Sequence, residues 1–239
     1  MRKIWLICRK DLQEAFGQRS LIVRPLVVAA LMPFLLLYSI ATHPIVMHRP
    51  IFQNSLLPFD LLLLTFGGST LTLITAATAI AGEKERRTSE ALLAAPITDT
   101  ELFIGKALAA FLPGVVLGYL VQLLFGVLLL AIAAHEQVTV TVEPRVLAVA
   151  LLLVPLLTLL VAATGLIASA RSNTLLSATQ IAALVSLPVT GVAIYVAYQA
   201  MSGTAEQAAR YLGLLLLAGV ALLRAGTRLV NREAIVSRL

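Results

Sequence analysis

Charged residues are scarce in this sequence. They make up 13% of its 239 residues, whereas 59% of the residues are hydrophobic. A water-soluble domain of this length needs far more charge to cover its surface, so a soluble globular fold is excluded. The composition places the chain in a lipid bilayer.

Cysteine and the common catalytic motifs are also missing or nearly so. Cys8 is the single cysteine, so no intrachain disulfide can form and no cysteine cluster can hold zinc. The sequence contains no G-x-x-x-x-G-K-[ST] loop for nucleotide phosphates, no H-E-x-x-H and no G-x-S-x-G. His43, His48 and His135 are scattered without the spacing of metal ligands. We therefore expect no catalytic residue, metal site or cofactor in this chain, which disfavours a membrane enzyme.

Long runs without charge predict the membrane spans. A helix rises about 1.5 Å per residue, so about 20 apolar residues cross the hydrocarbon layer. Arg210 and Arg224 flank a short apolar core near the C-terminus, and their long side chains must reach the headgroups for that core to span. We predict an all-α integral membrane protein, one domain over residues 1–239, with six transmembrane helices at about 22–42, 58–82, 103–134, 146–170, 174–198 and 208–226.

Two segments need a separate interpretation. Residues 2–20 place one set of residues on a common helical face, namely Ile4, Cys8, Leu12, Ala15 and Phe16, which predicts an amphipathic helix in the membrane surface. Trp5 suits the headgroup level of that surface. The fifth charge-free run is too long for one crossing, and Pro188 could either start a re-entrant outer helix over residues 188–205 or bend one long helix. The sequence leaves these two possibilities open.

The distribution of cations predicts the orientation. With the N-terminus in the cytoplasm, fifteen of the 18 lysines and arginines fall on the cytoplasmic side, and Arg49, Arg145 and Arg210 fall outside. This asymmetry follows the positive-inside rule. It also explains the net charge of +6 without a nucleic-acid partner. We expect a multi-pass protein of the cell inner (plasma) membrane with both termini cytoplasmic.

Several polar residues lie inside the predicted spans. Hydroxyl residues recur along the second span beside Gly67 and Gly68, among them Thr65, Ser69, Thr72, Thr75 and Thr78. Small and hydroxylated residues either allow close helix packing or line a wet pathway. Thr72, Gln122 and Gln180 are the candidate points of a substrate pathway, and interhelical hydrogen bonds are the alternative for each of them.

A charged segment, residues 83–101, joins the second and third predicted spans on the cytoplasmic side. Pro96 should end its first helical part, and Thr98 or Asp99 can cap the next helix with Glu101 nearby. Mixed charges beside an apolar edge suit either a solvated connector or a docking surface for a soluble partner. Physical reasoning alone leaves both open.

The motif in this segment resembles the signature of ABC-2 type permeases, the membrane subunits of a class of ATP-binding-cassette exporters. The matching residues are the run from Gly82 to Leu93, then Ala95-Pro96-Ile97, then Gly105-Lys106. Arg87 stands where the family commonly has glycine, and Ala95 where serine is common. The resemblance extends over the whole chain, including the interfacial helix, the six spans and the basic tail.

The resemblance implies a function and partners. Such permeases place a coupling helix in a groove of a separate ATP-binding subunit, and the loop from Arg171 to Asn173 would supply a second contact. The implied coupling residues are Glu83, Lys84, Glu85, Arg86, Arg87, Glu90, Pro96 and Arg171. The implied assembly has two ATP-binding subunits that hold ATP and Mg, and a second copy of this permease or a homologous one. Its cargo would be a small or amphiphilic substrate, which the family exports.

The alternative is an ATP-independent secondary transporter or channel. That class tends to carry ionisable groups embedded in the membrane for ion coupling. Asp60 comes nearest to this in the sequence, but Pro58 before it and the apolar run after it place it near the outer boundary. A role in capping the following helix suits Asp60 better than ion coupling does.

Overall fold

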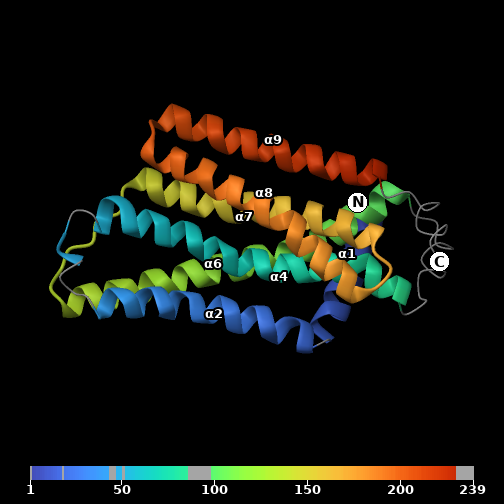
Figure 1. Cartoon of the computed structure of the whole chain (residues 1–239), viewed down its shortest axis with the longest axis horizontal. Helices are drawn as coiled ribbons and strands as arrows, with labels where there is room; N and C mark the ends of the chain where they lie inside the picture. Colours follow the sequence, from blue (N-terminus) through green and yellow to red (C-terminus); the bar gives the residue numbers. More distant parts are fainter. Residues whose placement is uncertain (1, 18, 43–46, 50–51, 86–97, 230–239) are drawn as a thin grey trace.

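The computed structural model describes residues 2–17, 19–42, 47–49, 52–85 and 98–229. This part of the chain forms long helices that run side by side, with the short α1 at one end of the bundle (Figure 1). The elements are α1 (Arg2–Gly17), α2 (Arg19–Ala41), the π-helical turn η1 (Phe52–Leu56), α4 (Leu57–Glu85), α6 (Asp99–His135), α7 (Pro144–Arg171), α8 (Leu175–Ser202) and α9 (Ala205–Leu229). Figure 1 places the C-terminal ends of α4 and α7 and the N-terminal ends of α6 and α8 beside α1, and we name this end of the bundle the α1 end.

Five of the described helical stretches are long and apolar enough to cross a membrane. They are Phe52–Glu85, Asp99–His135, Pro144–Arg171, Leu175–Ser202 and Ala205–Arg228. These candidate spans lie along the chain where the last five spans were predicted. The protein is therefore a multi-pass membrane protein.

The first predicted span corresponds to α2, which begins earlier than predicted. The helix starts at Arg19, and its apolar portion covers only Val23–Tyr38. Arg19 and Arg24 in the first two turns shorten the uncharged part. The crossing of the membrane by α2 thus stays a prediction.

The long fifth run forms one continuous helix. α8 passes through Pro188 without interruption, ends at Ser202 and is followed by Gly203 and then by α9. Thr174 caps the start of α8, because its side chain accepts a hydrogen bond from Ser177 N at 3.2 Å. Of the two interpretations of residues 188–205, the structure therefore shows the single helix, with no re-entrant segment.

The protein core lies around α4 and α7. α4 packs against α2, α6, α7 and α8, and α7 packs against α8 and α9. Fully buried leucines of both helices, such as Leu62 and Leu153, form this core with Phe125 of α6. The peripheral helices expose large apolar side chains, including Leu184 of α8 and Leu217 of α9. Lipid tails cover such side chains in a bilayer, so their exposure carries no penalty there.

The backbones of α4 and α6 approach very closely at three glycines. A Cβ atom on Gly68 would lie 2.3 Å from the carbonyl oxygen of Gly114 and 2.9 Å from the Cα of Gly118. A Cβ on Gly114 would lie 1.8 Å from the hydroxyl oxygen of Thr72. Only glycine fits such contacts, and small residues permit close helix approach in lipid in general. The glycines fix the relative position of α4 and α6.

Candidate functional site

The candidate site is the junction where α4 ends. Glu83, Lys84 and Glu85 are its last three residues, and each contacts a different neighbour. Glu83 forms an ion pair with Lys106 of α6, with 2.9 Å between Oε1 and Nζ. Lys84 reaches the end of α7, and Glu85 reaches the start of α8. Three consecutive residues thus tie the end of α4 to three other helices.

The contacts of Lys84 and Glu85 match the dipoles of the helices that they reach. Lys84 Nζ donates hydrogen bonds to the carbonyl oxygens of Ala170 at 2.7 Å and of Ser172 at 3.4 Å. Glu85 Oε2 accepts a hydrogen bond from the backbone N–H of Leu175 at 2.8 Å. A cation at a helix C-terminus and an anion at a helix N-terminus are both stabilising. Both residues therefore satisfy helix ends within this chain.

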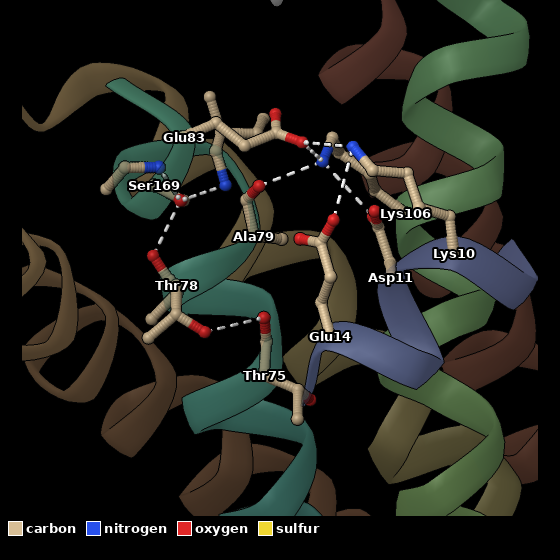
Figure 2. Close-up of polar contacts among 12 residues, drawn as sticks. Lys10, Asp11, Glu14, Thr75, Thr78, Ala79, Glu83, Lys106 and Ser169 are labelled. Carbon is tan, nitrogen blue, oxygen red and sulfur yellow. Dashed lines mark hydrogen bonds and ion pairs between the residues drawn. The ribbon is translucent and has the colours of Figure 1, made fainter. Parts of the chain in front are cut away.

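Lys106 is the centre of the buried ion cluster at this junction (Figure 2). Its Nζ atom lies 2.9 Å from Glu83 Oε1 and 3.1 Å from Asp11 Oδ2 of α1, and it donates to the carbonyl oxygen of Ala79 at 2.9 Å. Its side chain is 1% exposed, and those of Asp11 and Glu83 are 12% exposed. A buried ammonium needs such partners, because an unpaired charge out of water is very costly.

Gly105 explains how α1 reaches this cluster. A Cβ on Gly105 would lie 2.9 Å from Ile7 Cβ and 3.2 Å from the carbonyl oxygen of Ile4, so α1 packs directly on the α6 backbone. That packing brings Asp11, one turn further along α1, to Lys106. The two halves of the sequence motif, residues 83–85 and 105–106, therefore meet in space, and α1 supplies a third partner.

Sequence reasoning missed Asp11. The signal was present, because Asp11 interrupts the apolar face of α1 that Ile7 and Cys8 help to form. A carboxylate on an otherwise apolar helix face indicates a buried partner. The identity of that partner, 95 residues away, was not readable from the sequence.

Lys10 extends the cluster toward the surface. Its Nζ lies 3.4 Å from Glu14 Oε1 and 3.7 Å from Glu83 Oε1, and the side chain is half exposed. Partial burial lowers the pKa of Lys10, but the carboxylates of Glu83, Glu14 and Asp11 outweigh it, so the pKa lies above its usual value. Lys10 is therefore charged at neutral pH and adds a second cation beside Glu83.

One side of α1 packs against α6, and most of the residues predicted for its apolar face lie on that side. Ile4, Leu12 and Ala15 are partly buried and Cys8 is fully buried on the side that faces α6. Phe16, predicted on the same face, is 59% exposed and does not take part in this packing. Trp5 is 58% exposed on the outer side of the helix. The packing against α6 takes up the predicted apolar face, and the aromatic side chains remain outside.

The other residues of the predicted coupling set divide into two groups. Arg86, Arg87, Glu90 and Pro96 lie outside the described residues. Arg171 is the last residue of α7, with an exposed side chain. Of the two predicted caps for α6, the structure selects Thr98, whose hydroxyl accepts from Glu101 N at 3.2 Å while Glu101 Oε2 accepts from Thr98 N at 2.9 Å.

The three candidate pathway residues have different surroundings. Thr72 is fully buried at the α4–α6 crossing and donates to Gly68 O at 3.1 Å. Gln122 is buried in α6 and donates to Ala150 O of α7 at 3.3 Å. Gln180 is exposed on α8. The contact of Gln122 is an interhelical hydrogen bond, the alternative given for it, whereas the bond of Thr72 lies within α4.

Hydroxyl groups along α4 are satisfied within their own helix. Thr65, Ser69 and Thr75 donate to Leu62 O, Phe66 O and Leu71 O at 2.6, 2.9 and 2.9 Å. Such bonds to the preceding turn satisfy a hydroxyl without water. The polar stripe of α4 is therefore compatible with a tightly packed helix and does not require a wet pathway.

Cys8 offers a direct test of the α1–α6 contact. Its side chain is fully buried, and burial and the nearby Asp11 carboxylate both raise the pKa of the thiol. Because the thiolate is the reactive form, we expect Cys8 in the detergent-solubilised protein to react with N-ethylmaleimide at least about 100-fold more slowly than an exposed thiol. Mass spectrometry of labelled protein measures the rate.

The control for this measurement is a Thr100→Cys variant, because Thr100 is exposed in the first turn of α6. Asp11→Asn should accelerate the labelling of Cys8, because it weakens the tie between α1 and Lys106. Equal rates at positions 8 and 100 in the same protein would show that α1 is not docked on α6.

The chain is thus a helical membrane protein whose charged motif gathers five helices at one end. A family model described as ABC-2 family transporter protein matches residues 48–218. The chain belongs to this family, and it is therefore a membrane-embedded transport permease of the ABC transporter class. Family membership implies association with an ABC ATP-binding subunit. No curated protein sequence matched the chain.

Proposed function

We propose that this chain is the membrane-spanning subunit of an ABC exporter, which works as a dimer above two ATP-binding subunits. The observation that carries the proposal is the triple contact of Glu83, Lys84 and Glu85 at the end of α4. A force applied to the chain just after Glu85 reaches α6, α7 and α8 through direct polar contacts. Lys106 passes it on to α1. This arrangement suits the conversion of ATP-driven movement into movement of the helices.

The proposal divides the coupling residues by role. Glu83, Lys84 and Glu85 bind within the chain and transmit movement. Arg86, Arg87, Glu90, Pro96 and Arg171 are offered to the ATP-binding subunit, with complementary charges fixing its register. ATP and Mg belong to that subunit, and this chain binds no cofactor.

The membrane placement follows from the same proposal. The α1 end faces the cytoplasm, both termini are cytoplasmic, and the membrane is the inner (plasma) membrane. α2 is the first of the six proposed spans: its 23 residues rise about 34 Å at 1.5 Å per residue, of which the apolar part Val23–Tyr38 accounts for about 24 Å against a hydrocarbon layer of about 30 Å. Trp5 and Phe16 of α1 lie at the headgroup level, where exposed aromatic side chains are favourable.

Co-purification tests the central claim. We expect the tagged chain, extracted from native membranes in mild detergent, to retain a soluble subunit with a phosphate-binding loop at about one to one. Mass spectrometry identifies that subunit. If the chain is purified alone and vesicles that contain only this chain move solute along an ion gradient, the secondary-transporter alternative replaces the proposal.

A charge exchange tests the docking residues. The double variant Arg86→Glu/Glu90→Arg keeps the net charge, but it sets like charges against the partner, which costs several kcal/mol. We expect the amount of ATP-binding subunit that co-purifies per copy of this chain to fall at least about tenfold, since every 1.4 kcal/mol changes affinity tenfold. Quantitative mass spectrometry of the two subunits measures the ratio.

The structure provides a matched control for this exchange. Glu206 and Arg210 are an exposed ion pair four residues apart on α9, at the end opposite α1. Glu206→Arg/Arg210→Glu makes the same exchange away from the docking region and should leave the subunit ratio unchanged. A normal ratio in the Arg86/Glu90 variant would contradict the assignment of these residues to docking.

A further inference from the structure

Ser169 of α7 makes an unusual contact with the backbone of α4. Its hydroxyl oxygen accepts hydrogen bonds from the N–H groups of Ile80 at 3.1 Å and Ala81 at 3.0 Å, and it donates to the carbonyl oxygen of Ala77 at 2.6 Å. Figure 2 shows the hydroxyl directed at this turn of α4. The side chain is fully buried. One hydroxyl from another helix therefore contacts three backbone groups within a single turn.

These three groups belong to the hydrogen-bond ladder of α4. In a regular α-helix the N–H of Ala81 pairs with the carbonyl of Ala77, and the N–H of Ile80 pairs with the carbonyl of Ala76. Ser169 offers a second partner to Ala77, Ile80 and Ala81. A side chain inserted at the ladder is a recognised cause of helix bending.

The other described hydroxyls of α4 and α7 provide a contrast. Thr75 and Thr78 of α4 and Thr158 and Thr164 of α7 donate to carbonyls of their own helices. These hydroxyls bond to backbone groups of their own helix, whereas Ser169 bonds to backbone groups of a neighbouring helix. Ser169 thus has a different function from the ordinary buried serine or threonine of this bundle.

The cost of bending a helix in lipid explains the value of this contact. Opening one turn inside a membrane leaves N–H and C=O groups without water or a partner, which is strongly unfavourable. At the Ala77–Ala81 turn, Ser169 can keep these groups paired while the ladder opens. Gly82, which follows directly, has a low helix propensity and also favours bending here.

The position of the turn connects it with the junction described above. On one side, the glycine contacts fix the middle of α4 to α6. On the other side, Glu83, Lys84 and Glu85 hold the end of α4. The Ser169 contact lies between these two anchored parts. A bend at this turn would let the end of α4 move relative to its middle.

We propose that Ser169 is a positioning residue that makes the Ala77–Ala81 turn of α4 a hinge, so that the end of α4 pivots against the membrane-embedded part during ATP-driven transport. This inference rests on the proposed coupling function. Ser169 acts by lowering the cost of the bent state. A serine that merely joins α4 to α7 would stabilise the fold without this effect.

A distance measurement across the hinge tests the proposal. One spin label is placed at Thr100→Cys in the first turn of α6, because Lys106 connects this part of α6 to the end of α4. The second label is placed at Leu184→Cys in the middle of α8. Both positions are exposed, and the background carries Cys8→Ser. The complex with the ATP-binding subunit is measured by pulsed electron paramagnetic resonance without nucleotide and with ATP plus vanadate. Dilution with unlabelled chain removes distances between copies.

The expected result compares four proteins. The wild-type sequence and Thr164→Ala, which removes another buried hydroxyl of α7, should both gain a second distance with nucleotide. Ser169→Ala should show at least about fivefold less of this second distance, because an unpaired buried group penalises the bent state. Ser169→Thr, which keeps a hydroxyl, should restore it. The melting temperature of each complex is also measured, because it reports whether a variant has lost only the stabilising contact between α4 and α7.

The outcomes separate the hinge from the proposed function. If the unmodified complex gains the second distance and Ser169→Ala gains it equally, the hinge is wrong while the coupling function stands. This holds even if Ser169→Ala melts at a lower temperature, because such a result describes a purely structural contact. If the unmodified complex shows no change with nucleotide, the coupling function fails, and the hinge fails with it.

Discussion

Replacing Lys106 by methionine is expected to lower the stability of the protein by about 3–5 kcal/mol, the usual cost of removing one member of a buried ion pair. The substitution leaves the Asp11 and Glu83 carboxylates facing each other with little exposure and without the shared ammonium. For a chain of this size each kcal/mol shifts the melting midpoint by about 2–4 °C, so we expect a decrease of about 10 °C. Circular dichroism in detergent or nanodiscs measures it.

Two further variants identify the cause of this loss. Lys10→Met removes a half-exposed cation of the same cluster and should cost less than about 1 kcal/mol, as exposed pairs usually do. The triple variant Lys106→Met/Glu83→Gln/Asp11→Asn should recover most of the stability, because no unpaired charge is left behind. Equal destabilisation by Lys10→Met and Lys106→Met would show that burial of the cluster is not what matters.

Replacing Gly68 by alanine is expected to be about as damaging. The new Cβ would lie 2.3 Å from Gly114 O and 2.9 Å from Gly118 Cα, and neither backbone atom can move without shifting a whole helix. Overpacking a core typically costs 1–3 kcal/mol, and with backbone on both sides we expect a cost of about 3 kcal/mol or more. The corresponding decrease in melting midpoint is about 6 °C or more.

α6 contains its own control for this prediction. A Cβ on Gly126 would meet nothing within 4 Å. Gly126→Ala should therefore be neutral or stabilise the protein by up to about 1 kcal/mol, since alanine has the higher helix propensity. If the Gly68→Ala and Gly126→Ala variants have the same melting midpoint, the close crossing of α4 and α6 does not exist in the folded protein.

The span boundaries were largely predictable because they depend on local composition. The length and charge of each apolar run determine whether a helix can cross the bilayer. Five such helices occur where the sequence predicts them. Helix ends differ from the predicted boundaries by a few residues: α2 starts at Arg19 where about 22 was predicted, and α8 ends at Ser202 where about 198 was predicted. Helix ends shift easily by such amounts, because arginines at a terminus can extend a helix beyond its apolar part.

The cap of α6 and the continuity of α8 show where local patterns remain ambiguous. Thr98 and Asp99 are both good N-cap residues, and the capping box with Glu101 selects Thr98. Pro188 can end a helix or lie within one, and neighbouring helices in a membrane protein can satisfy the groups that proline frees. The sequence therefore allowed both outcomes in each case, and the structure shows one.

The sequence by itself determined that this protein lies in a membrane, where most of its helices run and which segment carries the permease motif. Only the tertiary structure decided what the polar residues contact. Asp11 meets Lys106 across 95 residues, and Ser169 meets Ala77 across 92. It also showed that Glu83, Lys84 and Glu85 bind other helices of the same chain. The physical reason is that hydropathy and capping act over one span or one turn, whereas a buried charge or hydroxyl is satisfied by whichever group the packing of distant helices brings within about 3 Å.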